Sequence, residues 1–94
     1  MHEITKVEPL DGYRLRLTFD DGTEGVVDVA KLTDLKGVFE PLRDASKFHE
    51  VRVHSELGTV YWANGADLDP DVLYSLVTGT PIDIQATVRN FMRP

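Results

Sequence analysis

Three aspartates at every second position, Asp67, Asp69 and Asp71, are spaced as carboxylates are in a cation-binding loop. The EF-hand calcium loop opens in this way, with a glycine at its sixth position and a bidentate glutamate at its twelfth. Those positions fall here on Val72 and Thr78, so the pattern of that loop is broken. Carboxylates also gather at the positive end of a helix, where each contributes about 0.3–1 kcal/mol. We favour a helix start and expect no metal ion at these residues.

Other residue types that support catalysis are present without a recognisable arrangement. His49 and His54 lie on either side of an expected boundary between a helical turn and a strand, which is not the spacing of zinc ligands. The absence of cysteine excludes thiolate nucleophiles, disulfides and Cys-ligated zinc. The serines lie outside any nucleophile elbow, the glycines match no phosphate loop, and no pair among the 16 acidic residues stands out as an acid and a base. We therefore expect no enzymatic activity and no cofactor.

The segment from Tyr61 to Asp67 combines aromatic and polar residues in the way that protein-binding anchors do. It holds the only tryptophan, Trp62, followed by Asn64-Gly65, a dipeptide typical of a left-handed turn. Because neighbouring strand residues point to opposite faces, Tyr61 and Trp62 do not both face one core unless the sheet is covered twice. We predict partner binding by Tyr61, Trp62, Asn64 and Asp67. The alternative is that Trp62 completes the core and the turn only redirects the backbone.

The elements that position this segment begin with an expected β-hairpin. Apolar residues alternate with arginine and threonine over residues 13–19, which is the period of a strand with one wet face. A two-residue loop would set Leu15 opposite Asp28, whereas a three-residue loop sets Leu15 opposite Val27. We predict the three-residue loop, with Gly22 in the left-handed region of backbone space.

Three further strands complete the expected sheet. Residues 4–7 precede the first hairpin, although Ile4 and Val7 are out of phase for a flat strand. Residues 51–54 alternate apolar and polar side chains, and residues 59–63 are expected to form their partner across a turn. This makes a second hairpin.

Helical spacing appears in two segments. Between residues 30 and 44 apolar residues recur at this spacing, but Gly37 and Pro41 interrupt them, which favours short helical turns. Asp44 is placed to cap one further turn, through Phe48.

The most strongly specified helix begins at Asp69 and Pro70 and ends at Gly79. The carboxylate of Asp69 accepts from free backbone N–H groups, and proline suits the first helical position, where no donor is needed. Glycine is the commonest residue after the last turn. The expected buried stripe of this helix comprises Val72, Leu73, Leu76 and Val77. A last segment places Ile84, Val88 and Phe91 on one helical face.

Length and composition bound the architecture. A chain of 94 residues has room for one hydrophobic core, and 41% apolar with 28% charged residues is the composition of a globular protein. We predict an α+β fold, with an antiparallel sheet of two hairpins plus an N-terminal strand packed with two or three short helices. Residues 1–79 are expected to form a single domain and residues 80–94 a helical extension of it.

The charge balance argues against some partners. Ten Lys and Arg residues against 16 Asp and Glu residues give a net charge of −6, so phosphate backbones are repelled and direct nucleic-acid binding is not expected. Two arginine pairs, Arg14 with Arg16 and Arg89 with Arg93, are interpreted as solvated faces. No run of 18 apolar residues occurs, and the N-terminus lacks the apolar stretch of a signal peptide. We expect a cytoplasmic protein that does not enter the membrane.

Three stretches of the chain resemble one bacterial family, namely residues 15–22 (LRLTFDDG), residues 37–44 (GVFEPLRD) and, most specifically, residues 62–74 (WANGADLDPDVLY). The family is called domain of unknown function 2442, and the resemblance extends over about residues 3–76. It implies an α+β fold of paired strands and short helices, with no established activity. Some longer relatives carry a helix-turn-helix domain after this one. Some short relatives are encoded beside another small protein, in the manner of toxin and antitoxin.

Three functional hypotheses follow from these observations. The leading one is a protein-interaction module, the acidic, antitoxin-like member of a small bacterial pair, which binds another small protein through Tyr61, Trp62, Asn64 and Asp67. The second is a sensor or scaffold domain associated with a helix-turn-helix regulator, although only about fifteen residues follow Gly79, too few for that unit. The third is an enzyme or small-ligand binder that acts through the clustered aspartates, which a deep pocket lined by Asp67 and His54 would support. A homo-oligomer is compatible with all three.

Overall fold

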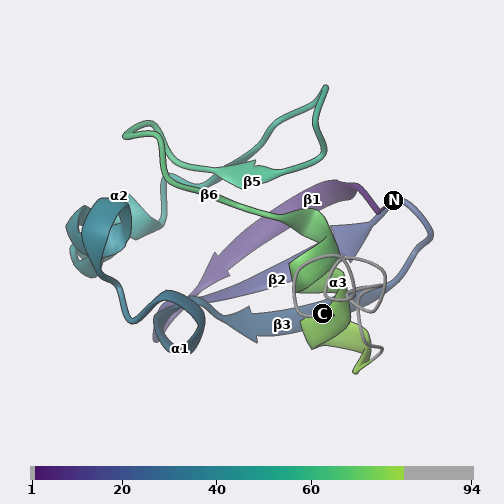
Figure 1. Ribbon diagram of the computed structural model, residues 1–94, viewed down its shortest axis with the longest axis horizontal. Coiled ribbons are helices and arrows are strands. Elements are labelled where there is room, and N and C mark those ends of the chain that lie inside the picture. Colours follow the sequence, from purple (N-terminus) through teal and green to yellow (C-terminus); the bar gives the residue numbers. More distant parts are fainter. Residues whose placement is uncertain (1, 80–94) are drawn as a thin grey trace, which may run out of the picture.

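The computed structural model describes residues 2–79, so the helical extension predicted for residues 80–94 lies outside the described residues. The fold is α+β, as predicted, with its strands divided between two three-stranded antiparallel sheets (Figure 1). The first sheet contains β1 (Ile4–Leu10), β2 (Arg14–Phe19) and β3 (Glu24–Asp28), in that order. The second contains β4 (Arg52–Val53), β5 (Val60–Tyr61) and β6 (Asp67–Leu68). The helices are α1 (Val29–Thr33), the 3-10 helix η1 (Gly37–Arg43), α2 (Ala45–Phe48) and α3 (Pro70–Thr78).

The first hairpin has the predicted three-residue loop. Leu15 pairs with Val27, and the Phe19 N–H donates to the Thr23 carbonyl at 2.8 Å across the loop. Gly22 has φ of +87°, in the left-handed region that the loop requires. This register places Leu15, Leu17 and Phe19 of β2 on the same face as Val27 of β3, because side chains alternate along a strand. Leu15 and Val27 are accordingly buried.

A β-bulge in β1 resolves the phase conflict seen in the sequence. Ile4 pairs with Phe19 and Lys6 pairs with Thr18, so two residues of β1 advance against one of β2. The extra residue lets both Ile4 and Val7 contact the core, which a flat strand forbids. The strand also continues to Leu10, beyond the predicted end at residue 7.

The second sheet differs from the prediction in two ways. Its first two strands are shorter than expected, with two residues each. The sequence interpretation also missed β6, which pairs Val60 with Leu68 after the Asn64-Gly65 turn reverses the chain. The two hairpins lie in separate sheets instead of one, and β6 is the second neighbour of β5.

Both predicted helix caps are confirmed. The Asp44 carboxylate accepts from the Ser46 N–H at 3.0 Å, and the Asp69 carboxylate accepts from the Asp71 N–H at 2.8 Å. The predicted stripe on α3 needs one correction. Leu73 is fully buried, but Leu76 is 53% exposed, so the buried face of the helix is narrower than the predicted stripe.

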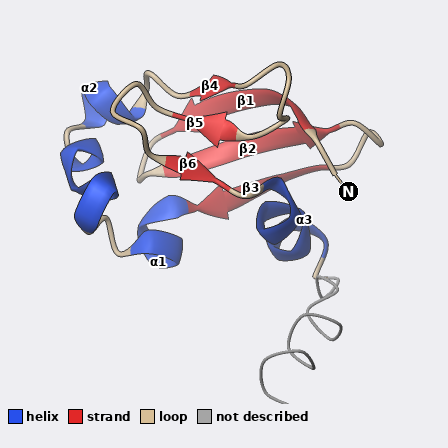
Figure 2. Ribbon diagram, turned by 45° about the horizontal axis from the view of Figure 1, so that its top comes forward, coloured by secondary structure: helices blue, strands red, loops and turns tan. Residues whose placement is uncertain are grey.

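The hydrophobic core takes side chains from both sheets and from the helices. Figure 2 shows α1, α2 and α3 placed around the strands. Leu17 of the first sheet, Val60 of the second and Leu73 of α3 have no solvent exposure. Helix α3 approaches β3 so closely that a Cβ at Gly25 would lie 2.3 Å from a methyl group of Val77. A glycine in β3 is therefore what permits this helix to pack on the sheet.

Candidate interaction site

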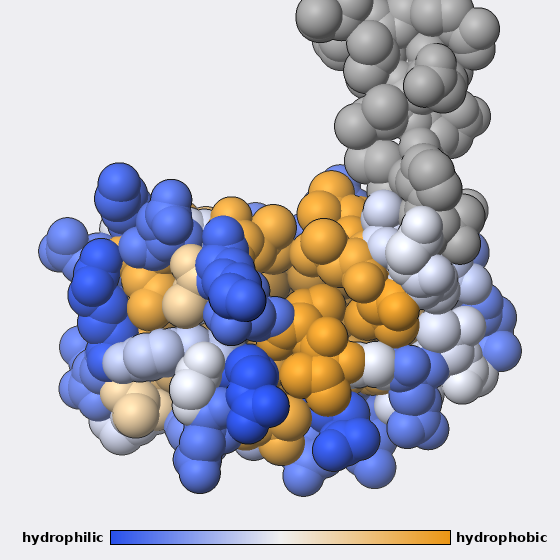
Figure 3. All heavy atoms as spheres, turned by 90° about the horizontal axis from the view of Figure 1, so that it is seen from below, coloured by the Kyte–Doolittle hydropathy of each residue, from blue (hydrophilic) through white to orange (hydrophobic). Residues whose placement is uncertain are grey.

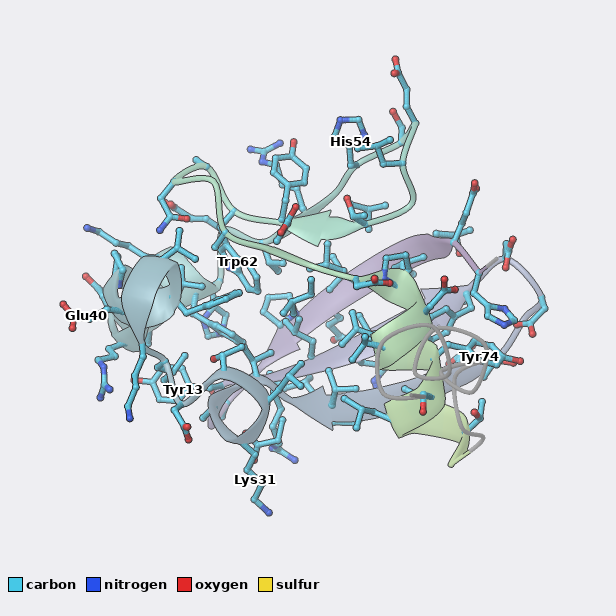
Figure 4. All side chains as sticks on the ribbon, in the orientation of Figure 1. Tyr13, Lys31, Glu40, His54, Trp62 and Tyr74 are labelled. Carbon is cyan, nitrogen blue, oxygen red and sulfur yellow. The ribbon has the colours of Figure 1, made fainter. Side chains whose placement is uncertain are left out.

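The predicted binding segment forms part of the outer face of the second sheet. Tyr61 pairs with Arg52 on one side and with Asp67 on the other, so the three side chains form a row on one face. The ring of His54 lies 5.8 Å from that of Tyr61, at the tip of the β4–β5 hairpin (Figure 4). Tyr61 is half-buried and Asp67 is exposed. This row brings together two of the four predicted residues.

Trp62 points in the opposite direction, into the core (Figure 4). Its side chain is 2% exposed, and the indole N–H donates to the Phe48 carbonyl at 2.9 Å. The rings of Phe39 and Phe48 pack against it at 6.3 Å and 5.8 Å. The alternative that Trp62 completes the core is therefore the correct one, and its ring is not available as a surface anchor.

Asn64 stabilises the turn and ties it to a neighbouring element. Its side-chain oxygen accepts from the Ala66 N–H at 3.2 Å, and its amide donates to the Val38 carbonyl at 2.8 Å. Gly65 has φ of +96°, as expected for the second residue of this dipeptide. An open hollow of about 420 Å³ lies beside the turn, lined by Pro41, Leu42, Lys47, Glu50, Trp62, Ala63 and Asn64.

The three aspartates have separate structural roles. Asp69 caps α3, and Asp71 accepts from the His2 backbone N–H at 3.0 Å. Asp67 lies in the surface row beside Tyr61. Within residues 2–79, no three His, Asp or Glu side chains are close enough to share a metal ion. Neither Asp67 nor His54 lines the hollow beside Asn64 or the second hollow described below, so the ligand-binding hypothesis gains no support from them.

A second surface, which the sequence interpretation missed, lies along β3. A hollow of about 400 Å³ is lined by Val26, Val27, Asp28, Lys31, Leu32 and Leu76, and we call these six residues the β3 groove. Three of the apolar side chains are exposed to solvent, Val26 by 43%, Leu32 by 37% and Leu76 by 53%. Figure 3 views the molecule from the side of α1, β3 and α3 and shows apolar residues gathered there.

The exposure of Val26 follows from local geometry. Val26 follows the strand alternation, so its side chain lies on the face opposite to that of buried Val27. Two consecutive valines in a strand with one wet face were the signal in the sequence that one apolar side chain would face solvent.

The backbone of β3 is also open along this groove. β3 is the last strand of its sheet, and no strand among the described residues pairs with its second edge. An unpaired edge presents free N–H and C=O groups to any chain that approaches. The β3 groove therefore combines exposed apolar side chains with unused backbone donors and acceptors.

A polar cluster at the other end of the first sheet joins its loop to α3. The Tyr74 hydroxyl donates to the Asp21 carboxylate at 2.6 Å, and the Thr23 N–H donates to the same carboxylate at 2.9 Å. These hydrogen bonds lower the pKa of Asp21 to about 2, that of Tyr74 contributing most. The ring of His2 stacks on that of Tyr74 at 3.5 Å. This cluster fastens the N-terminus and the loop after β2 to the helix.

None of the helices among residues 2–79 is long and apolar enough to cross a membrane.

In α2, hydrogen bonds from the Ser46 hydroxyl and backbone N–H lower the pKa of the capping Asp44.

Comparisons with known proteins identify a family and a similar solved structure. The model of a family described as "Protein of unknown function (DUF2442)" matches residues 4–79. Among solved structures, the chain is similar to "Putative DNA Binding Protein NE0471" from Nitrosomonas europaea ATCC 19718, with a TM-score of 0.72 and 28% identity. That similarity covers 93% of this chain and 52% of the other, so the chain spans about half the length of the Nitrosomonas protein. A search of curated proteins gave no match.

Proposed function

The chain belongs to the DUF2442 family, whose function is unknown, and we propose that it is a protein-interaction module that binds another small protein through the β3 groove. In this proposal it acts in the bacterial cytoplasm as the acidic, antitoxin-like member of a pair. The surface row of Arg52, Tyr61 and Asp67 is a secondary contact at most, since its expected anchor Trp62 is buried.

One observation carries this proposal. Val26, Leu32 and Leu76 are three of the five large apolar side chains that are exposed among the described residues, and all three line one hollow. Apolar side chains scattered singly over a surface need no explanation, whereas a contiguous apolar patch marks an interaction site. Two consecutive elements, β3 and α1, and the distant helix α3 converge to build it.

The experiment is co-expression of the chain with the product of the adjacent gene, followed by titration calorimetry. We expect a complex that Leu76→Asp weakens by at least about 30-fold, the loss of about 2 kcal/mol that defines an interface hot spot. Leu57→Asp is the matched control, because Leu57 is 62% exposed and belongs to the β4–β5 turn, away from the groove (Figure 1). Absence of a complex, or equal losses in the two variants, would refute the proposal.

A second candidate function is favoured by the length comparison. The Nitrosomonas protein bears a name that refers to DNA binding, and about half of it lies outside the match. We propose as the second candidate a sensor or scaffold domain that serves a helix-turn-helix regulator. In this case adding the chain would slow the migration of the regulator–DNA complex in a gel beyond the shift that the regulator alone causes. Leu76→Asp would abolish that additional shift.

A further inference from the structure

We infer that the β3 groove binds its partner by strand addition, in which a basic β-strand of the partner pairs with the free edge of β3 and extends the first sheet to four strands. The inference rests on the proposed function, because it concerns how the same groove holds a protein. It adds two properties of that protein, an extended backbone and an alternation of apolar and basic side chains.

The backbone of β3 is arranged for such pairing. The Phe19 N–H donates to the Thr23 carbonyl at 2.8 Å, and the Val29 N–H donates to the Tyr13 carbonyl at 2.9 Å. Backbone groups in an antiparallel pair alternate in direction, so odd-numbered residues between Thr23 and Val29 face β2. The N–H and C=O groups of Glu24 and Val26 therefore point to the free edge.

Two helices leave this edge accessible between them. Helix α1 follows β3 directly, and α3 packs on its other end, where Gly25 meets Val77 (Figure 2). The opposite edge of the sheet is partly closed, because the Ile4 N–H donates to the Gly58 carbonyl at 2.8 Å. In the second sheet the outer strands β4 and β6 have only two residues each. With five residues, β3 is longer than either of these two strands.

The side chains specify the chemistry of the incoming strand. Its residues on the core side would meet Val27, Leu32 and Leu76, so apolar side chains are favoured there. On the outer face Val26 lies between Glu24, which has uncharged Thr18 opposite on β2, and Asp28, which has Arg14 opposite and caps α1. A basic residue opposite Glu24, whose charge has no cation opposite it on β2, and an apolar residue opposite Val26 give the complementary pattern. The net charge of −6 acts in the same direction by attracting a basic protein.

The same acids argue against a second copy of the chain as the occupant. Full antiparallel pairing of two β3 strands about Val26 would place Glu24 of each copy opposite Asp28 of the other. Like charges directly opposite one another destabilise a strand pair.

The first test uses a capped synthetic peptide whose central five residues are Lys-Val-Val-Ile-Arg. Its first, third and fifth residues lie opposite the three residues Glu24, Val26 and Asp28, so the N–H groups of these peptide residues face β3. The N–H groups of the second and fourth peptide residues point to solvent. By titration calorimetry with the full chain we expect this peptide to bind. N-methylation of its third residue should weaken the affinity at least about 10-fold, which corresponds to the loss of about one hydrogen bond between uncharged groups. N-methylation of the second residue should leave the affinity within about 2-fold. Replacing the basic residues by glutamate should abolish binding.

The second test changes the protein. Val26→Pro removes an N–H that points away from β2, so it should keep the fold, as verified by circular dichroism, and lose the peptide. Equal affinities for the two N-methylated peptides would overturn strand addition. So would the absence of binding at about 1 mM peptide, the result expected if residues 80–94 or a second copy fill the groove. A complex with the adjacent gene product that depends on Leu76 but tolerates Val26→Pro would refute strand addition and leave the proposed function intact.

Discussion

At the scale of the residue, Asp21 links pH to stability. Its folded-state pKa of about 2 is below the ordinary 3.8, chiefly because Tyr74 donates a hydrogen bond to the carboxylate. A depressed pKa contributes stability above about pH 4 that is lost as pH falls toward 2. Asp21 is exposed, so solvent reduces the size of this contribution.

We therefore predict that urea denaturation of the wild-type chain shows a falling free energy of unfolding between about pH 4 and pH 2, and that Asp21→Asn removes part of this fall. Tyr74→Phe should remove a similar part, because it keeps the ring that stacks on His2 and lacks the donor. Asp20→Asn in the same loop serves as the control. An unchanged pH dependence in Asp21→Asn would contradict this assignment.

Gly22 gives a prediction about the backbone alone. Its φ is +87°, and a Cβ added there would meet no atom within 4 Å. The cost of Gly22→Ala is then conformational, about 1–2 kcal/mol, and Gly22→Asn should cost less because asparagine tolerates the left-handed region. Thermal unfolding of the three proteins measures this order. Equal stability of all three would show that the loop adopts another conformation.

Residue types also show how far the sequence could predict the site. Gly22, Asp44 and Asp69 have the predicted roles, because each depends on the conformation of a few neighbouring residues. The orientation of Trp62 depends on which face of β5 meets the core, and alternation left both faces open. Two of the predicted binding residues, Tyr61 and Asp67, do share a surface row. The β3 groove was not foreseen, because its residues come from three separate elements.

At the scale of the element, the packing of α3 on β3 depends on a missing side chain. A Cβ at Gly25 would lie 2.3 Å from a methyl group of Val77 and 3.1 Å from its Cβ. Since valine has one rotatable side-chain bond, it has little room to move aside. The contact therefore requires glycine at this position.

Gly25→Ala should destabilise the protein by about 1–3 kcal/mol, the usual range for overpacking. The double variant Gly25→Ala with Val77→Ala should recover part of that loss, because the two changes relieve the same clash. Chemical denaturation of the four proteins forms a double-mutant cycle. Additive effects in this cycle would mean that α3 does not contact β3 at Gly25.

Other elements show which features of the fold the sequence patterns could not predict. The bulge in β1 adds a residue that no period-two pattern accounts for, although the mismatch between Ile4 and Val7 indicated an irregular strand. Strand β6 has two residues, too few for alternation to be recognised. Leu76 was placed in the buried stripe because periodicity alone does not limit how wide a face the sheets cover.

At the scale of the whole molecule, the net charge of −6 should prevent DNA binding by the chain alone. We predict no change in the fluorescence anisotropy of a labelled duplex at physiological salt, even with the protein in large excess. A basic DNA-binding domain assayed in parallel is the positive control. Saturable binding by this chain would contradict the proposal that it serves DNA-binding proteins only through a partner.

The proposed function depends most on which face of the molecule contacts another protein. Amide hydrogen exchange of the chain, free and in complex with the adjacent gene product, measures this directly. We predict slower exchange at Glu24 and Val26 and in α1, with the row of Arg52, Tyr61 and Asp67 unchanged. Protection of that row, with β3 exchanging as in the free chain, would contradict the assignment of function to the β3 groove.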